Sequence, residues 1–379
     1  MSNFVNTSTF INRDKEISYL KKWIEEEPNN ILFIHGPKSS GKTTLLLKFI
    51  NKELSKKKYD LKFFNLRDIL INNYKDFLRV FFEIDYSKSK SDVKKKKEYN
   101  LKVFKQTIEV INGIEINEIN PFVVMKKDIQ TLVKKKKCPV IIIDEIQSLQ
   151  NIYFNAQKEL INELFNFFVA LTKESHLCHV IIASSDGYFI EKIYKDSKLK
   201  KTSKFLLIDY LNKEDVFYWL SNLDKESKIS DYSLNKQQIE KIFNTLGGSC
   251  WEIYDFLSDL RRIVNSSKIE EIEFDELILE KITRSCAVFD DYIGVIEKRK
   301  KFFIKLHRIL QKNKNFFRER DFESMVKKGL LSPEELKDIL CELVRENIIS
   351  YNPTLAKYSL QGKIMEHGLN KYLKEINII

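Results

Sequence analysis

The stretch that decides the fold is Ile31-Leu-Phe-Ile-His-Gly-Pro-Lys-Ser-Ser-Gly-Lys-Thr-Thr-Leu45. The apolar residues Ile31 to Ile34 predict a short buried strand, and the apolar run that begins at Leu45 predicts the buried face of a helix. Between them, Gly36 to Thr43 fits the pattern G-x-x-x-x-G-K-[ST] at every fixed position. Strand, glycine loop and helix in this order are the context that a phosphate-binding loop (P-loop) requires. The sequence therefore predicts a nucleotide site here.

The residue types in this loop suit a triphosphate. Gly36 and Gly41 allow the backbone to curl so that successive N–H groups point at phosphate oxygens. The helix that starts near Lys42 directs its positive dipole end at the same anion. Lys42 can reach the β- and γ-phosphates, and the Thr43 hydroxyl can ligate Mg²⁺. The alternative is a glycine turn that happens to precede Lys-Thr, and the flanking strand and helix disfavour it.

A second part of the site follows the β-branched run Val140 to Ile143, which predicts a central parallel strand buried on both faces. Asp144 and Glu145 stand at its carboxyl end, where open α/β sheets place ligands. Asp144 would hold hydrated Mg²⁺ together with Thr43. Glu145 is placed to orient or deprotonate the attacking water. The alternative is a strand that ends in an acidic turn; the preceding P-loop favours the catalytic interpretation, which is the Walker B pattern.

Further strands are predicted at residues 59–66, 180–183 and 205–208, and a long apolar-rich helix at 155–172. A polar residue that leaves the strand beside the P-loop strand could contact the γ-phosphate or the lytic water. We predict Ser184 for this role, and a turn that caps the next helix stays open as the alternative. The sequence assigns no function to the insertion at 68–121.

Composition limits the class of protein. The chain has 379 residues, 43% hydrophobic and 31% charged, which predicts a globular rather than a disordered protein. No apolar run has the length of a membrane span and the N-terminus lacks a signal-peptide pattern, so we expect a cytoplasmic protein. Five scattered cysteines indicate neither a disulfide framework nor a zinc site. A net charge of +11 is compatible with a nucleic-acid partner, although lysine runs such as 94–97 are more often solvated faces.

After Leu211 the pattern becomes helical. Asn212 is a predicted N-cap, and helices are expected over residues 213–220, 237–246 and 250–262, with Gly247-Gly248 ending the second. These helices suit a small lid over the nucleotide. Their apolar positions are more often core than ligand contacts, so only Arg261 or Arg262 is a candidate phosphate sensor.

The last segment, from about Glu297, predicts three helices followed by a β-hairpin at residues 348–360, which is a winged helix. Ser332-Pro333 predicts the start of the third helix. That helix would enter a DNA major groove in one interpretation, but its many acidic residues disfavour contact with phosphate. A winged helix used for protein contacts or for intramolecular packing is equally open.

Taken together, these pieces resemble a known family. Phe10-Ile-Asn-Arg-Asp-Lys-Glu16 resembles the F-[IV]-x-R-[DE]-x-E box of the archaeal ATPase family, a branch of the AAA+-like signal-transduction NTPases. Both Walker motifs, Ser184-Ser185 and Gly247-Gly-Ser-Cys-Trp251 follow in that family's order. The last resembles its G-G-x-P lid motif, with Cys250 where proline is usual. The resemblance implies an architecture similar to that of origin-recognition ATPases. It also implies ATP rather than GTP, with the Phe10–Arg13 segment near the adenine.

We therefore expect an α/β fold: a parallel-sheet P-loop ATPase core of the AAA+-like type over residues 1–210, a helical lid over 211–296 and a winged-helix domain over 297–379. The expected function is that of an ATP-binding, Mg²⁺-dependent ATPase that acts as a nucleotide-driven switch. The alternatives are an ATP-regulated factor that binds double-stranded DNA and a protein-interaction or defence switch without DNA affinity. No membrane partner is expected, and an oligomer is possible.

The expected site residues follow from these patterns and from the resemblance. The expected catalytic residues are Lys42, Glu145 and Ser184, and the expected Mg²⁺ ligands are Thr43 and Asp144. The expected ATP-binding residues are Phe10, Arg13, Gly36, Pro37, Lys38, Ser39, Ser40, Gly41, Lys42, Thr43 and Thr44.

Overall fold

The computed structural model describes residues 10–68, 70–72, 76–77, 121–154, 158–195, 199–264, 269–313 and 316–379. Most of the insertion 68–121 and the lysine run 94–97 lie outside these residues. Within the described ranges, no helix has the length and apolar character needed to cross a membrane. All five cysteines are free thiols.

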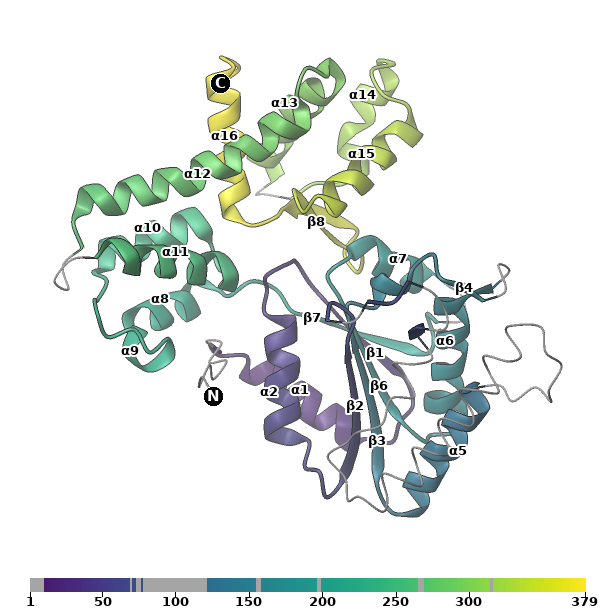
Figure 1. Cartoon of the computed structure of the whole chain (residues 1–379). Helices are drawn as coiled ribbons and strands as arrows, with labels where there is room; N and C mark the ends of the chain where they lie inside the picture. The colour runs from purple at the N-terminus through teal and green to yellow at the C-terminus, as the bar shows by residue number, and fades with distance from the viewer. Residues whose placement is uncertain are drawn as a thin grey trace.

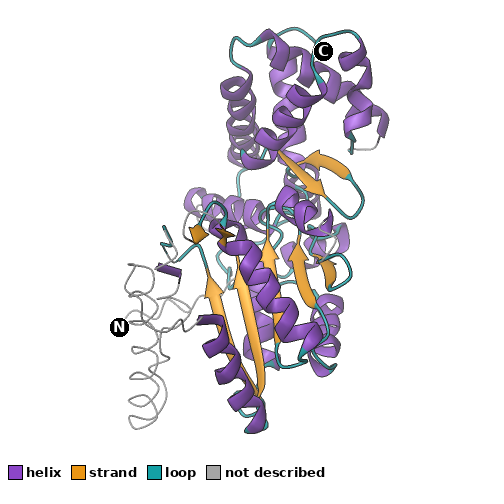
Figure 2. Cartoon of the chain, turned by 90° about the vertical axis from the view of Figure 1, so that its right-hand side faces the viewer, coloured by secondary structure: helices purple, strands orange, loops and turns teal. Residues whose placement is uncertain are grey.

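A five-stranded parallel sheet forms the centre of the N-terminal half (Figures 1 and 2). Its strands, in spatial order, are β2 (Tyr59–Asn65), β3 (Cys138–Asp144), β6 (His179–Ser184), β1 (Ile31–His35) and β7 (Ser203–Leu207). Alternate residues of the central strands face opposite sides. Ile141 and Ile143 therefore join one hydrophobic cluster, while Val140 and Ile142 join another. The predicted double-sided burial of this strand is confirmed.

Helices cover both faces of the sheet (Figure 1). One face packs against α1 (Asp14–Glu25) and α2 (Lys42–Glu53). The other packs against α5 (Pro121–Lys134), α6 (Leu160–Val169) and α7 (Gly187–Lys195). Shorter elements connect them: a 3-10 turn (Ile146–Leu149), the strands β4 (Tyr153–Phe154) and β5 (Lys158–Glu159), and a π-helical turn (Ala170–Glu174). The carboxyl ends of all five strands meet at one edge, where the predicted site residues lie.

The chain then forms a helical lid. Its helices are α8 (Lys213–Ser221), α9 (Leu223–Glu226), α10 (Lys236–Leu246) and α11 (Cys250–Ile263). Asn212 caps α8 as predicted, because its side-chain oxygen accepts a 2.8 Å hydrogen bond from the Asp215 amide. Trp219, Ile242 and Phe256 meet in the core of the lid.

The C-terminal part is a winged helix. It comprises α13 (Glu297–Asn313), a 3-10 turn (Glu319–Phe322), α14 (Glu323–Lys327), α15 (Pro333–Arg345), the hairpin strands β8 (Ile349–Asn352) and β9 (Lys357–Leu360), and α16 (Lys363–Glu375). Ser332 caps α15 and forms a capping box with Glu335, as the Ser-Pro start predicts. The hairpin is the wing.

One long helix, α12 (Glu271–Ile293), joins the lid to the winged helix (Figure 1). Its first half contributes Phe274 to the lid core, and its second half contributes Phe289 to the winged-helix core. In the same way α16 contributes Ile364 to the first core and Leu369 to the second. The boundaries 1–210, 211–296 and 297–379 remain predictions, since no linker separates the last two units.

The Asn12 amide donates to Asp215 of the lid at 2.5 Å. Two local predictions are wrong in detail. The helix predicted over 155–172 begins only at Leu160, after the small hairpin of β4 and β5, and residues 155–157 lie outside the described part. The fifth strand ends at Leu207 rather than at Ile208.

Candidate nucleotide-binding site

The glycine loop connects β1 to α2, and its two glycines are required for different reasons. A Cβ at Gly36 would lie 2.0 Å from the carbonyl oxygen of Ile208, so only glycine lets the loop pass this close to the chain after β7. Gly41 has φ 90°, in the left-handed region that favours glycine, and it is the N-cap of α2. The loop therefore curls over the amino end of α2.

Lys42 is buried at the first position of α2. Its Nζ donates to the carbonyl oxygens of Gly36 at 3.0 Å and of Pro37 at 2.8 Å. Burial lowers its pKa to about 8, although the carboxylates of Glu145 and Asp144 oppose the shift. The ammonium thus lies inside the curve of the loop, where it could exchange carbonyl partners for phosphate oxygens.

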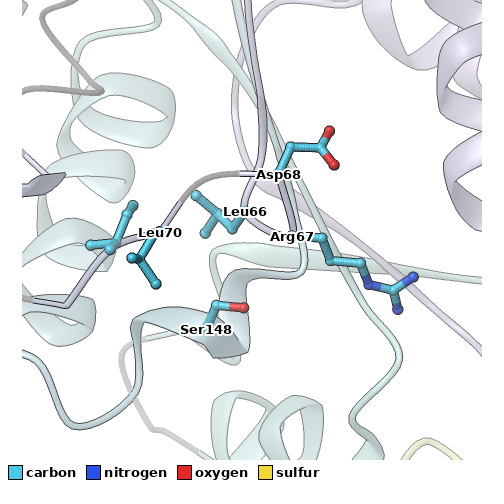
Figure 3. Close-up of a pocket in the computed structure, with 6 residues that line it drawn as sticks. Leu66, Arg67, Asp68, Leu70 and Ser148 are labelled. Carbon is cyan, nitrogen blue, oxygen red and sulfur yellow. The ribbon is translucent and has the colours of Figure 1, made fainter.

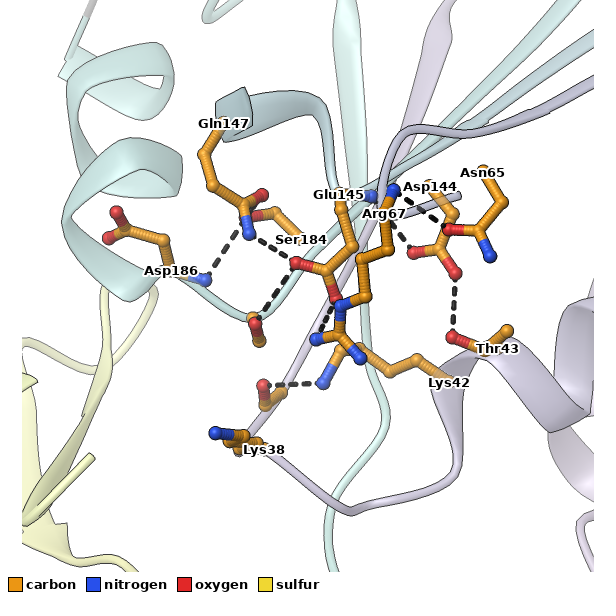
Figure 4. A network of polar contacts seen from close by, with 12 residues as sticks. Lys38, Lys42, Thr43, Asn65, Arg67, Asp144, Glu145, Gln147, Ser184 and Asp186 are labelled. Carbon is orange, nitrogen blue, oxygen red and sulfur yellow. Dashed lines mark hydrogen bonds and ion pairs between the residues drawn. The ribbon is translucent and has the colours of Figure 1, made fainter. Parts of the chain in front are cut away.

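Thr43 and Asp144 meet across the P-loop and the end of β3. The Thr43 hydroxyl donates to Oδ2 of Asp144 at 2.6 Å, and Asp144 is 1% exposed (Figure 4). One hydroxyl and one carboxylate are the hard oxygen ligands that Mg²⁺ prefers when phosphates and waters complete its shell. The donor set therefore fits a Mg²⁺–nucleotide.

Glu145 has φ 60°, and both of its carboxylate oxygens are engaged. Arg67 forms an ion pair with Oε1, and the Gln147 amide donates to Oε2 (Figure 4). The Ser185 hydroxyl lies 3.5 Å from the same Oε2. Glu145 is thus held at the sheet edge by groups that follow the ends of β2, β3 and β6.

Sequence reasoning missed Arg67. Its position follows from strand pairing: β2 and β3 run parallel with Asn65 opposite Asp144, so the turn after β2 lies beside Glu145. Figure 3 shows the Arg67 guanidinium extending away from Leu66 and Leu70. These two leucines line a hollow of about 500 Å³, separate from the cleft that the P-loop lines. The available signal was a basic residue just after a predicted strand. That signal points to the site only when the order of the strands in the sheet is known.

Ser184 is fully buried at the end of β6. Its hydroxyl donates to Oε1 of Gln147 at 2.8 Å and accepts from the Asp186 amide at 3.0 Å. Ser185, the next residue, lines the cleft. A phosphate contact by Ser184 stays a prediction, and Ser185 is the serine with direct access to the cleft.

Arg13 joins three parts of the core. It adopts φ 78°, and its guanidinium donates to the carbonyl oxygens of Ser40 at 3.0 Å and Asp209 at 2.5 Å. Phe10 packs against the sheet, with Nζ of Lys48 5.3 Å from its ring centre. In this arrangement Arg13 supports the P-loop from outside the cleft. The contacts of Phe10 and Arg13 with adenine stay predictions.

The cleft itself has a volume of about 870 Å³ and is lined by the P-loop, the lid and the winged helix. Lys38, Ser39, Gly41, Lys42, Thr43 and Thr44 line one side. From the lid come Cys250 and the half-exposed rings of Trp251 and Tyr254. The winged helix contributes Asn347, Gln361 and Met365. Arg261 and Arg262 instead pair with Asp231 and Asp259.

Comparison with known proteins agrees with this geometry. Residues 10–256 match the family model described as an ATPase domain predominantly from Archaea.

The chain belongs to this archaeal ATPase family.

Two relatives in the family are uncharacterized ATP-binding proteins of Methanocaldococcus jannaschii. One is 38% identical over 347 residues, which cover 86% of this chain and 96% of the relative. The other is 34% identical over 377 residues, covering 96% and 99%. Among solved structures, the ORC2 protein of Aeropyrum pernix, in its ADPNP–ADP complexes, matches with a TM-score of 0.52 and 11% identity over 100% of this chain and 98% of that chain. At this identity the likeness concerns the fold alone.

Proposed function

We propose that this archaeal ATPase family member hydrolyses ATP with Mg²⁺ and that its nucleotide state controls the position of the winged helix. The first part is carried by the convergence of Lys42, Thr43, Asp144 and Glu145 at one sheet edge. Lys42 would hold the β- and γ-phosphates, and Glu145 would accept a proton from the water that attacks the γ-phosphorus in line. Mg²⁺ held by Thr43 and Asp144 would neutralise phosphate charge.

The test compares ATP binding and phosphate release in wild type, Lys42→Ala and Glu145→Gln. Lys42→Ala should weaken ATP binding by about 30- to 150-fold, because a charge-assisted contact is worth roughly 2–3 kcal/mol. Glu145→Gln should keep its affinity and lose about 10²- to 10⁴-fold in kcat, the usual contribution of a general base. Lys52→Ala, an exposed lysine on the same helix, is the matched control and should match wild type. Full turnover by Lys42→Ala would refute the proposal.

The second part rests on contacts between the winged helix and the ATPase core. The Gln361 amide donates to the carbonyl oxygen of Lys38 in the P-loop at 3.3 Å. The hydroxyls of Tyr188 on α7 and Tyr358 on β9 lie 2.8 Å apart, and the Tyr188 ring stacks on Tyr351 of β8. Because α7 begins two residues after Ser185, a change in the P-loop or at the end of β6 would move the groups that hold the wing.

A factor that reads DNA with the third helix and the wing is less well supported. Four of the 13 residues of α15 are acidic and two are basic, which disfavours a phosphate backbone. The wing is packed against α7 through Tyr351 and Tyr358. A protein partner, an oligomer and a cytoplasmic location stay predictions.

A further inference from the structure

The helix that opens the winged helix, α13, concentrates positive charge on one side. Seven of its 17 residues are Lys or Arg, and one, Glu297, is acidic. Lys301, Lys305, Arg308 and Lys312 are separated by four, three and four positions, so they share one face of the helix, the basic face. We propose that the basic face binds the phosphate backbone of duplex DNA, independently of base sequence. This inference goes beyond the proposed ATPase function.

The basic face points to solvent. Phe302, Leu306 and Leu310 form the buried side of α13, and the basic face lies on another side of the helix. All four of its side chains are exposed or partly exposed. Lys301 makes a 3.8 Å ion pair with Glu297 on the same helix, and the other three have no carboxylate partner among the residues that the structure describes. Their charge is therefore available to an external anion.

Ion pairs join the start of α13 to the acidic helix α15. Lys298 and Arg299, at the start of α13, pair with Glu335 at 2.8 Å and with Glu342 at 3.2 Å. By the same spacing, Lys298 lies three positions before Lys301 and continues the basic face, so Glu335 of α15 neutralises the start of that face. Further along the helix, Lys305, Arg308 and Lys312 have no carboxylate partner among the described residues, and α13 lies at the end of the molecule remote from the sheet (Figure 1). An anionic partner would therefore be attracted to the first helix of this winged helix.

The chemistry of the basic face favours nucleic acid over a protein partner. No described residue of α13 is an exposed large hydrophobic, whereas stable protein interfaces are anchored by apolar or aromatic side chains. At about 1.5 Å per residue, Lys301 to Lys312 extend over roughly 16 Å. One DNA strand presents a phosphate every ~3.4 Å along the axis, so this length faces several phosphates. The exposed Val295 and Ile296 lie before the helix begins and are not part of the basic face.

The test is fluorescence anisotropy of a labelled 30-base-pair duplex with the full chain at 50–300 mM KCl. Neutralisation of four phosphates predicts that log K falls with log [salt] with a slope of about −3.6. The variant Lys301→Gln/Lys305→Gln/Arg308→Gln/Lys312→Gln should bind at least about 10-fold more weakly at 100 mM and should lose most of that slope. A second duplex of unrelated sequence should bind wild type equally.

The matched control replaces four exposed lysines that precede β2 and β3, at the edge of the sheet away from the nucleotide site: Lys56→Gln/Lys57→Gln/Lys134→Gln/Lys135→Gln. It carries the same change in net charge and should bind DNA nearly as wild type does. Circular dichroism melting and ATP turnover should be unchanged in both variants, so failure of this proposal and failure of the ATPase proposal are distinguishable. Three results would overturn the inference: no wild-type binding at 50 mM salt, equal losses in the two variants, or binding to poly-glutamate or phosphatidylserine vesicles without binding to duplex.

Discussion

Among single residues, Arg67 has the largest consequence for Glu145, the proposed general base. With Arg67 on one carboxylate oxygen of Glu145 and Gln147 on the other, the base is already engaged on both sides. Glu145 must part from one of these partners before the attacking water can donate a hydrogen bond to it. Arg67 itself is 55% exposed, so this ion pair is weak and can open at small cost.

Removal of Arg67 should therefore release Glu145. Arg67→Ala is expected to raise the basal kcat by roughly fivefold, since an ion pair of this exposure is worth at most about 1 kcal/mol. Steady-state phosphate release is the measurement. Arg67→Lys, which keeps the cation, should stay within about twofold of wild type by the same estimate. A fall in kcat together with a rise in KM would show instead that Arg67 contacts the nucleotide.

Lys42 gives the site a pH dependence. Burial lowers the pKa of its amine from the ordinary 10.5 to about 8. The ammonium that phosphate requires is therefore present below pH 8 and is lost above it, so ATP affinity should fall by about tenfold between pH 7 and pH 9. Because bound phosphate stabilises the protonated form, binding near pH 8 should take up protons. Calorimetry in two buffers measures both effects. Lys42→Arg, which stays charged, should show neither, and a flat wild-type profile would contradict the assignment.

Among elements, local patterns were predictable and tertiary contacts were not. The strands β1, β3 and β6 are continuous apolar runs, and the cap of α15 is formed by neighbours in sequence, so both could be read directly. The hydrogen-bond partner of Asn12 is Asp215, 203 positions away, and no local pattern predicts that pair. Arg67 reaches Glu145 only because β2 pairs with β3. The site residues that the motif contains were predictable, and those that the fold brings to it were not.

The contact between α7 and the wing depends on a glycine. A Cβ at Gly187 would lie 2.3 Å from the carbonyl oxygen of Tyr351, which is backbone and cannot move alone. Gly187→Ala should therefore push the wing away from α7 and speed tryptic cleavage after Lys357 by roughly tenfold, equivalent to about 1.4 kcal/mol of lost docking. Gly329→Ala is the control: its Cβ meets nothing within 4 Å, and its φ of 67° adds a backbone strain that Gly187 does not have, so the control is the harsher change except for the clash. Equal cleavage rates in the two variants would argue against docking through α7.

In the whole molecule, the lid and the winged helix are packed together as one unit. Lys281 in α12 is 5% exposed and pairs with Asp255 and Asp259 of α11, which ties α12 to the lid. A Cβ at Gly368 of α16 would lie 2.4 Å from Oγ of Ser285, so α16 and α12 are in close contact. Contacts between this unit and the sheet domain include the Gln361 bond to the P-loop, the Tyr188 ring stacked on Tyr351, and Ile11 packed in the lid core. Any nucleotide-driven movement should therefore occur between the sheet and this combined unit.

ATP binding should consequently loosen the wing while leaving the α12–α16 contact intact. In Glu145→Gln, which should bind ATP without turning it over, saturating Mg²⁺-ATP is expected to speed amide hydrogen exchange of residues 349–360 by roughly tenfold, or about 1.4 kcal/mol. Exchange in α12 and α16 should not change, because their packing lies within the moving unit. Gln361→Ala in the same background removes the direct link to the Lys38 carbonyl and should reduce the response of the wing to ATP by more than half. Two results would contradict this: slower hydrogen exchange of the wing with ATP, or faster exchange of α12 together with the wing. Either would show that ATP does not act by separating the winged helix from the sheet.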